Sequence, residues 1–313
     1  MKAAAIDKFG PPEVLTVHTL PVPKIGPKEV LIAVRASGVG VWDAKLRAGD
    51  YAEGKEKFPL VLGSDGAGIV AKVGKSVRRL KPLDEVWAYQ YNNKKGGFNA
   101  EYVVVPANSV ERIPKELTLL EAGAAAATGI TALQGVEHLR LRRNETVLVF
   151  GATGAVGSLA VQFAKRTGAH VIATASTADG EKALHGVGID DVFDSRAADA
   201  STRLKALAPK GLNAVLAFAG GDALERCIDQ LVEGGRVAYP NGVEPEPRKR
   251  PKVRMIAYDG ETGRKAFERL NRAVAESHLK VLIADKFPLE QAAKAQARVE
   301  EPHLIGRVAL QIA

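Results

Sequence analysis

Along the chain, the pattern of apolar and polar positions changes character near residue 119. Before that point, short apolar runs end at glycine or proline, as in the segments 29–40, 66–74 and 98–107. Runs of this kind predict short strands joined by tight turns. Many short strands with glycine-rich turns favour an antiparallel, partly closed β-barrel.

From Leu119 onwards, the pattern alternates between helices and buried strands. An alanine-rich helix over residues 119–139 comes first, although Gly123 and Gly129 weaken it. The alternation then runs through the segments 145–152, 154–168, 170–176, 178–188, 191–195, 212–220, 223–235 and 235–242. Repetition of strand, helix and strand predicts a doubly wound parallel sheet with helices on both faces.

The C-terminal segment 289–313 predicts a helix, a turn and one strand. The alternating pattern of residues 306–312 suggests that this strand rejoins the first part of the chain. The expected fold is therefore an α/β protein in which a discontinuous barrel-like domain, residues 1–121 and 266–313, carries an inserted nucleotide-binding domain, residues 122–265. A length of 313 residues agrees with two domains rather than one.

Composition adds limits on compartment and chemistry. An apolar fraction of 46% and a charged fraction of 26% are those of an ordinary soluble globular protein. The single cysteine, Cys227, excludes an intramolecular disulfide and a zinc site built from several thiolates, and its helical context predicts a small core residue rather than a nucleophile. Without a signal peptide or an apolar run of membrane-spanning length, the sequence predicts a soluble, unsecreted, cytoplasmic protein with no membrane partner.

The net charge of +8 raises the question of an acidic partner. Part of the excess lies in residues 247–254, PRKRPKVR, which include Arg248, Lys249, Arg250, Lys252 and Arg254. Such a run is usually a solvated surface loop. Contact with an anionic ligand or partner and weak attraction of nucleic acid stay open as well. No aromatic residue is interleaved to stack on bases, so a nucleic-acid partner is not expected.

A glycine-rich turn between an expected strand and an expected helix supplies the clearest chemical signal. The sequence G-A-T-G-A-V-G spans residues 151–157. Gly151 allows a sharp exit from the strand, Gly154 lets the backbone approach a pyrophosphate, and Gly157 lets the helix pack close to the strand. The N–H groups and the positive end of the helix then favour phosphate groups. In this context, the motif predicts a dinucleotide-binding site.

The end of the next expected strand indicates which dinucleotide is bound. NAD sites usually place Asp or Glu there, to bind the ribose 2′-hydroxyl. This chain has Ser176 and Thr177 instead, with Lys182 in the following helix and Arg196 after the next strand. Hydroxyl and cationic groups favour a 2′-phosphate, so NADPH is expected rather than NADH. Asp179 is the nearest acid, and it would weaken this preference if it turned inward.

Read together, several stretches make the chain resemble a known family. They are FGPPEVL, GVGVWDAKLRAGDY, FPLVLGSDGAGIVAKVG, GGFNAEYVVVP, AAAATGITAL, and GATGAVG followed by ATASTADGEKA. Over essentially its whole length, the chain is similar to the zinc-independent quinone oxidoreductases, of the zeta-crystallin type, within the medium-chain dehydrogenase/reductase superfamily. The resemblance implies a GroES-like catalytic domain, a Rossmann domain and a homodimer, with the nicotinamide in the cleft between the domains.

The resemblance also implies which residues hold the cofactor. The glycine-rich turn would bind the pyrophosphate, two threonines of ATGIT would lie beside the nicotinamide, and the ends of two later strands would line the cofactor cleft. With Arg196 included, the expected cofactor-binding residues are Thr128, Thr131, Gly151, Ala152, Thr153, Gly154, Ala155, Val156, Gly157, Ser176, Lys182, Arg196, Ala219, Gly220, Pro240, Asn241 and Gly242.

Zinc is not expected. Zinc-dependent relatives carry Cys at the position of Gly40 and a His–Glu pair at the positions of Ser64 and Asp65, and their structural zinc lobe needs four cysteines. Without thiolate or imidazole ligands at these places, the sequence predicts no catalytic zinc. The quinone reductases often have Asn at the position of Gly40 and Tyr at that of Lys45. Both positions differ here, so the resemblance supports the identity of the cofactor more strongly than the identity of the acceptor.

The expected reaction is hydride transfer from the nicotinamide to a quinone or an α,β-unsaturated carbonyl, with the protein supplying orientation and a dry cleft. No acid–base pair stands out, and Tyr51 and Lys45 are the weak catalytic candidates. The expected substrate pocket comprises Gly40, Trp42, Tyr51, Ser64 and Tyr89.

Two other interpretations stay open. An enoyl-thioester or alkenal reductase of the same superfamily would use the same cofactor site, and the positive charge would suit the phosphates of CoA. A non-catalytic NADPH-binding protein, or an RNA-binding protein that uses the basic stretch, is the alternative of another class.

Overall fold

The computed structural model describes residues 1–52, 54 and 56–313, and the chain forms two compact units. The first unit comprises residues 1–127, 262–271 and 283–313, and the second comprises residues 128–261 and 272–282. The sequence analysis drew the domain boundaries at 121/122 and 265/266 and assigned residues 272–282 to the first domain, whereas this segment packs in the second unit. Which boundaries separate independently folding domains stays a prediction.

The first unit is built on two β-sheets. A three-stranded sheet has the order β2–β1–β4, and a larger sheet has the order β15–β16–β3–β5–β6–β8, with β7 paired to β3. All pairs are antiparallel except β15 with β16. The strands are β1 (Lys2–Ile6), β2 (Leu15–Thr19), β3 (Glu29–Val39), β4 (Leu60–Val61), β5 (Asp65–Val73), β6 (Glu85–Tyr89), β7 (Tyr102–Pro106), β8 (Val110–Arg112), β15 (Ile283–Pro288) and β16 (Arg307–Gln311).

The C-terminal strand joins this sheet as the sequence predicts. Val308 to Gln311 pair with Val39 to Ala36 of β3, in antiparallel register. The alternating pattern suggested one buried face, but residues 307–310 are all buried. Strand β16 is an interior strand between β15 and β3, and the burial of consecutive residues shows that protein covers both of its faces.

One helix of the first unit was not expected. The sequence analysis assigned only strands and turns before residue 119, yet α1 (Val41–Ala48) directly follows β3. The side chain of Asp43 accepts a hydrogen bond from the N–H of Gly40 at 2.9 Å, and Gly49 ends the helix with φ at 103°. Polar residues, Asp43 and Arg47, occupy its buried face, which hides the apolar spacing that marks a helix. The other helical segments of this unit are η1 (Pro12–Val14), η2 (Ala107–Ser109), η3 (Leu289–Gln291) and α8 (Ala292–Glu300).

The second unit contains the doubly wound parallel sheet that the sequence predicts. Its order is β11–β10–β9–β12–β13–β14, and every neighbouring pair is parallel. The strands are β9 (Thr146–Phe150), β10 (His170–Thr174), β11 (Asp191–Phe193), β12 (Leu212–Ala217), β13 (Leu231–Pro240) and β14 (Arg254–Tyr258). Strand β9 lies at the centre and its residues Val147 to Val149 are fully buried, as expected for a parallel strand covered on both faces.

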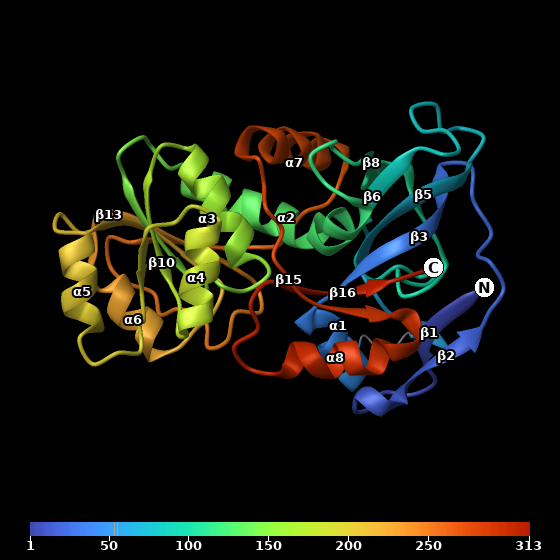
Figure 1. Ribbon diagram of the computed structural model, residues 1–313, viewed down its shortest axis with the longest axis horizontal. Coiled ribbons are helices and arrows are strands. Elements are labelled where there is room, and N and C mark those ends of the chain that lie inside the picture. The colour runs from blue at the N-terminus through green and yellow to red at the C-terminus, as the bar shows by residue number, and fades with distance from the viewer. Residues whose placement is uncertain (53, 55) are drawn as a thin grey trace. The chain divides into compact units, whose positions relative to one another are not determined.

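Helices cover both faces of this sheet. Helices α3 and α4 lie on one side and α5 and α6 on the other (Figure 1), as right-handed crossovers require. The helices are α2 (Leu119–Leu139), α3 (Gly157–Arg166), α4 (Ala178–Gly186), α5 (Ala200–Leu207), α6 (Asp222–Ile228) and α7 (Arg264–Ser277), and α2 and α7 each continue from one unit into the other. Among the described residues, none of these helices is both long and apolar enough to cross a bilayer.

Two expectations for this half of the chain were incomplete. The segment 223–235 was read as one helix, but α6 ends at Ile228 and β13 begins at Leu231, where it pairs with β12. Elements α5, β14, α7 and β15 were not assigned at all. Helix α7 does carry buried apolar residues at helical spacing, among them Phe267, Leu270 and Val274, and this signal was overlooked. Strand β15 is only partly buried, so its apolar pattern is weak.

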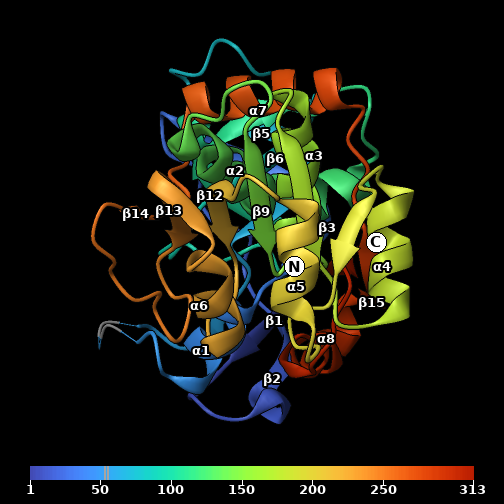
Figure 2. The same ribbon diagram turned by 90° about the vertical axis from the view of Figure 1, so that its left-hand side faces the viewer.

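The strand order places a crevice at a defined point of the sheet. Connections run outward in one direction from β9 through β10 to β11, and in the other direction from β12 through β13, so the order reverses between β9 and β12. Figure 2 shows β9 and β12 side by side in the sheet. In doubly wound folds, ligands bind outside the carboxyl ends of the strands at such a reversal.

Candidate functional site

The expected cofactor-binding residues of the second unit gather at one edge of its sheet. Residues 151–157 follow β9, Ser176 follows β10, Arg196 follows β11, residues 219–220 follow β12, and residues 240–242 end β13. Because all these strands are parallel, their carboxyl ends lie along the same edge. Five segments that are far apart in sequence are thus brought to one edge, on both sides of the reversal between β9 and β12.

The glycine-rich turn has the geometry that its sequence implies. Gly151 adopts φ of 76°, which favours glycine, and its N–H donates to Thr174 Oγ1 at 3.0 Å. A Cβ at Gly157 would lie 2.7 Å from Ala152 Cα and closer still to the carbonyl oxygen of Gly151, so the helix and the turn require glycine there. At Gly154, by contrast, the nearest atom to a Cβ would be 3.6 Å away. Backbone conformation therefore explains Gly151 and close packing explains Gly157, whereas neither accounts for Gly154.

The end of β10 exposes Ser176 beside the start of α4. Thr177, which the sequence analysis grouped with Ser176, is the N-cap of α4: its hydroxyl accepts from the N–H of Gly180 at 3.1 Å. Ser176, Asp179 and Lys182 are exposed to solvent. The hydroxyl of Thr177 thus caps α4, and Ser176 lies between the end of β10 and this cap.

Arg196 lies at the end of the neighbouring strand. Thr174 of β10 pairs with Phe193 of β11, so Ser176 and Arg196 follow adjacent strands at nearly the same level. Arg196 is exposed, and its backbone N–H donates to Asp194 Oδ1 at 2.9 Å, which fixes the turn after β11. The structure therefore places Ser176 and Arg196 after adjacent strands of the sheet.

The ends of β12 and β13 form the other side of the edge. Gly220 has backbone of Pro245 where a Cβ would stand, so only glycine fits there. Asn241 is fixed twice: its N–H donates to Tyr258 O at 2.8 Å, and its side-chain amide donates to Asp259 Oδ2 at 2.9 Å. Both segments are therefore held rigidly.

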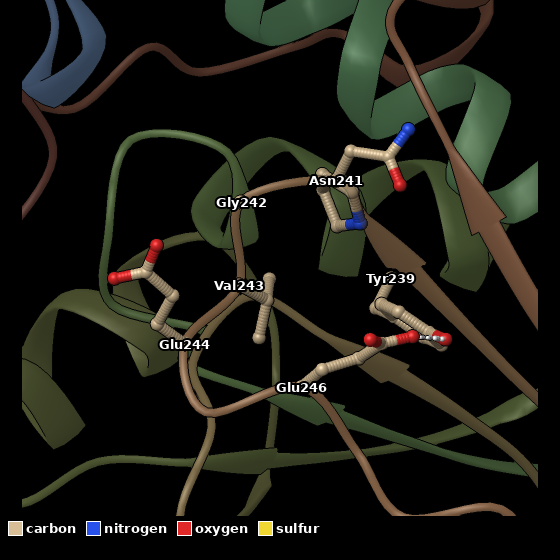
Figure 3. A pocket seen from close by; sticks show the side chains of 7 residues that line it. Tyr239, Asn241, Gly242, Val243, Glu244 and Glu246 are labelled. Atoms are coloured by element: carbon tan, nitrogen blue, oxygen red, sulfur yellow. Dashed lines mark hydrogen bonds between the residues drawn. The ribbon is translucent and has the colours of Figure 1, made fainter. Parts of the chain in front are cut away.

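A cavity of about 260 Å³ opens beside this segment, lined by residues 239–244 and Glu246. In Figure 3 the Glu246 side chain meets the hydroxyl of Tyr239, while Asn241 and Glu244 point away from this pair. The hydroxyl donates to Glu246 Oε1 at 2.7 Å. Burial, followed by this bond and the charge of Glu246, raises the pKa of Tyr239 to about 12, so the phenol stays protonated at neutral pH.

Helix α2 presents the two threonines expected beside the nicotinamide. Thr128 is fully buried and Thr131 is partly exposed. The hydroxyl of Tyr258 donates to the carbonyl of Thr131 at 2.9 Å, and burial raises the pKa of this tyrosine. A Cβ at Gly260 would lie 2.5 Å from Thr131 Oγ1, so the chain after β14 passes directly against this threonine.

Gln134 ties the same helix to that segment. Its side-chain oxygen accepts from the N–H of Glu261 at 2.9 Å, and its amide donates to the carbonyl of Glu261 at 2.7 Å. Gln134 and Tyr258 were missed by the sequence analysis. Neither forms a recognisable motif, because their partners lie more than a hundred residues away along the chain.

On the first unit, three expected pocket residues form one cluster. Trp42 Nε1 donates to Ser64 Oγ at 2.6 Å, and a Cβ at Gly40 would lie 2.5 Å from the Trp42 ring. Ser64 is buried and Trp42 is half-buried. Helix α1 therefore places the indole over the start of β5.

Three charged residues beneath this cluster were not expected. Arg307 Nη2 donates to Asp65 Oδ1 at 2.8 Å, and Asp65 Oδ2 accepts from the N–H of Ala127 at 2.9 Å. Burial raises the pKa of Asp65, against the opposing effects of Arg307 and the Ala127 N–H. Burial likewise raises the pKa of Asp43 to about 7, although the Gly40 N–H and Arg307 lower it. These residues lie on α1, β5 and β16, and only the fold brings them together.

Of the remaining candidates, Tyr89 lies beside this cluster, because it pairs with Asp65 across β5 and β6. Lys45 Nζ is 5.3 Å from the centroid of the Tyr51 ring, a cation–π distance, so the two weak catalytic candidates contact one another. The carbonyl of Tyr89, at the end of β6, accepts from Thr262 Oγ1 at 3.0 Å. Tyr89 therefore joins Gly40, Trp42 and Ser64, whereas Tyr51 contacts Lys45.

The donor atoms at the zinc position of the zinc-dependent relatives do not fit zinc. Gly40 supplies no ligand atom, and a cysteine side chain there would collide with the Trp42 ring. Ser64 accepts the indole N–H, and both carboxylate oxygens of Asp65 have partners. Among the described residues, no group of three or more His, Cys, Asp or Glu side chains is arranged to hold a metal ion. Zinc prefers thiolate and imidazole ligands, which this cluster lacks.

Most of the basic stretch 247–254 is paired within the second unit. Arg250 binds Glu225 of α6 at 2.7 Å and Asp229, which directly follows α6, at 2.8 Å. Lys252 binds Glu233 at 2.9 Å. Arg248 approaches Asp222 at 3.7 Å, and all four acids belong to the protein itself. Internal pairing reduces the charge available to RNA, so this stretch favours a structural role.

Cys227 behaves as the sequence analysis expected. It lies in the core of the second unit and is 4% exposed. Burial raises the pKa of its thiol to about 11, so the reactive thiolate is scarce at neutral pH.

Comparison with known proteins gives the family. The family model "Alcohol dehydrogenase GroES-like domain" matches residues 26–115, and "Zinc-binding dehydrogenase" matches residues 155–257. The quinone oxidoreductase of Rattus norvegicus is 30% identical over 326 residues, which cover 100% of this chain and 97% of the relative.

Two solved structures agree with this assignment. An NAD-dependent alcohol dehydrogenase is 31% identical with a TM-score of 0.92, covering 100% of both chains. The Escherichia coli quinone oxidoreductase complexed with NADPH is 26% identical with a TM-score of 0.86, covering 99% of this chain and 100% of the other. Because the similarity in sequence and fold extends over both units, the chain belongs to the quinone oxidoreductase family of the medium-chain dehydrogenase/reductase superfamily and is an NAD(P)-dependent oxidoreductase.

Proposed function

We propose that the protein is an NADPH-dependent reductase that transfers a hydride, without zinc, to a quinone or an α,β-unsaturated carbonyl. One observation carries the proposal: the glycine-rich turn and the four neighbouring strand ends lie at one edge of a parallel sheet, on both sides of the reversal between β9 and β12. Dinucleotides bind at this place in doubly wound folds, with the pyrophosphate at the helix N-terminus. Gly154, whose Cβ would meet no close neighbour, suits close approach of that group.

The preference for NADPH rests on residues of this chain, because the similar structures differ. One is an NAD-dependent alcohol dehydrogenase, and another was solved with NADPH. Ser176 and Arg196 follow adjacent strands, and Lys182 lies in the first turns of α4. A hydroxyl and two cations favour a 2′-phosphate, whereas a carboxylate at the strand end would repel it.

The protein's own part in the reaction is binding and orientation. A bound nicotinamide cofactor supplies the hydride. Thr131, fixed by Tyr258 and Gly260, would orient the nicotinamide ring from α2. On the first unit, the half-buried Trp42 would form a wall for the acceptor, and Tyr51 and Lys45 would donate hydrogen bonds to the acceptor oxygen. Holding the nicotinamide and the acceptor in a near-attack arrangement lowers the entropic part of the activation barrier.

The absence of zinc in this proposal follows from the donor set around Gly40, Ser64 and Asp65. All three positions are taken up by contacts with Trp42, Arg307 and α2. An acceptor that is already electron-poor, such as a quinone or an enone, needs no Lewis-acid metal for hydride addition. Oxidation of a simple alcohol or reduction of a simple ketone depends more often on such a metal.

An acceptor panel tests the proposal. NADPH and NADH consumption would be followed in parallel with 1,4-benzoquinone, an alkenal and crotonyl-CoA. Faster turnover of the quinone with NADPH would support the proposal, and faster turnover of crotonyl-CoA would favour an enoyl-thioester reductase instead. Protection against heat by NADPH without turnover of any acceptor would indicate a non-catalytic binding protein. We also propose the homodimer that the family resemblance implies, which light scattering of the purified chain would check.

A further inference from the structure

A buried ion pair on the acceptor side of the first unit takes no part in the proposed reaction. Arg307 is 3% exposed and Asp65 fully buried, and they are joined at 2.8 Å. The Arg307 guanidinium also lies 4.7 Å from the centroid of the Trp42 ring. A buried ion pair adds little stability over an apolar replacement, so stability alone does not explain its presence. Its contact with Trp42 suggests that it positions the indole.

The indole of Trp42 is held from several directions. Its N–H donates to Ser64 Oγ at 2.6 Å, and the guanidinium lies over the ring. Two glycines of the β3–α1 junction make room for this arrangement: a Cβ at Gly40 would lie 2.5 Å from the ring, and a Cβ at Gly38 would lie 2.5 Å from Arg307 Nη2. The indole cannot turn away without breaking both the hydrogen bond and the cation–π contact.

Of the four side chains in this cluster, only the indole is more than marginally accessible. Arg307, Asp65 and Ser64 are buried, whereas Trp42 is half-buried. A ligand that approaches the cluster therefore meets the indole first. Because its position is fixed, the indole acts as a rigid wall rather than as an adaptable surface.

We infer that Trp42 is the specificity-determining residue of the acceptor pocket and that Arg307, held by Asp65, is its positioning residue. The clamped indole limits the size of the acceptor, so single-ring quinones and short enones are accepted and fused-ring quinones are disfavoured. This inference rests on the proposed function, because it takes the cluster of Gly40, Trp42 and Ser64 as the acceptor side.

The size limit is tested with Trp42→Ala. Values of kcat/KM would be measured for 1,4-benzoquinone and for 9,10-phenanthrenequinone. Removing the indole should raise the ratio of the fused-ring to the single-ring value about tenfold or more, since hydrophobic pockets discriminate to this degree. The KM for NADPH should stay unchanged. An unchanged ratio, or equal loss with both quinones, would overturn the inference.

The positioning role is tested on the residues that hold the indole. Arg307→Met alone would leave Asp65 buried without its partner, so the double variant Arg307→Met with Asp65→Asn is used, alongside the milder Ser64→Ala. The double variant and Ser64→Ala should each raise the ratio of the fused-ring to the single-ring kcat/KM value, but less than Trp42→Ala does. Arg298→Met is the control, because Arg298 pairs at the surface with Asp285 at 2.7 Å. A ratio that moves equally in the control, or not at all in the two test variants, would refute the positioning role.

A readout independent of turnover separates this inference from the proposed reaction. Trp87 is fully buried against Phe267, and among the described residues its indole N–H has no hydrogen-bond partner. The variant Trp87→Phe therefore breaks no hydrogen bond, and it leaves Trp42 as the only tryptophan of the sequence. In this background, 1,4-benzoquinone should quench Trp42 emission saturably and the fused-ring quinone should quench it less. Ser64→Ala should lower the emission anisotropy. Quenching without turnover would refute only the reaction, whereas absence of saturable quenching would refute the inference.

Discussion

The buried carboxyl of Asp43 makes a prediction about pH and stability that can be worked out from the structure. Asp43 is 2% exposed, and burial raises its pKa from 3.8 to about 7. The Gly40 N–H and Arg307 oppose this shift, and the nearby charge of Asp65 adds to it. Below about pH 7, the neutral carboxyl is therefore the favoured form in the folded protein.

The sign of the effect follows from proton binding. Between about pH 4 and pH 7 the unfolded chain loses the Asp43 proton while the folded protein keeps it, so stability falls as the pH rises through this window. Above the folded pKa the loss is complete. From pH 4.5 to pH 8 the change amounts to about 3 kcal/mol for this group, since one pKa unit corresponds to about 1.4 kcal/mol.

The test compares the wild type with Asp43→Asn, whose amide resembles the neutral carboxyl and cannot ionise. Their difference in free energy of unfolding should shift by about 3 kcal/mol in favour of the variant between pH 4.5 and pH 8. Urea unfolding followed by tryptophan fluorescence reports on the correct unit, because Trp42 and Trp87 both belong to the first unit. The exposed Asp50, changed to Asn, serves as the control and should run parallel to the wild type. A constant difference between Asp43→Asn and the wild type across this range would refute the reasoning.

The second unit supplies the remaining predictions. Ser176→Asp should shift the ratio of kcat/KM values from NADPH toward NADH by about tenfold, because a carboxylate repels the 2′-phosphate; an unchanged ratio would mean that another residue reads the phosphate. Gly154→Ala should weaken NADPH binding in a fluorescence titration with little change in Tm, whereas Gly157→Ala should lower the Tm, because its Cβ would enter space filled by the turn. The opposite pattern would contradict the assigned roles. Arg250→Met should cost about 2 kcal/mol in urea unfolding followed by circular dichroism, because it leaves the buried carboxylate of Glu225 without its cation. A loss below about 0.5 kcal/mol would class the pair as an ordinary surface contact.

The sequence by itself determined the fold class and predicted where the cofactor binds. The apolar runs and the glycine-rich turn identified β9, α3 and β10. This was possible because a buried parallel strand and the turn that follows it are recognised from residues close together in the sequence. The same locality explains why Gly151 and Gly157 were read correctly, since their requirements arise from backbone that is close in sequence.

The tertiary structure alone decided which polar residues meet. Thr177 was selected with Ser176, and only the fold shows that its hydroxyl also caps α4. Asp65 and Arg307 are 242 residues apart, and no pattern along the chain relates them until β16 pairs with β3. Likewise, the basic stretch carries its charge in the sequence, but α6 supplies the acids that balance it. Hydrophobic periodicity along the sequence shows which face of a helix or strand is buried. Which residues meet across the core depends on the order of the strands, and only the folded chain fixes that order.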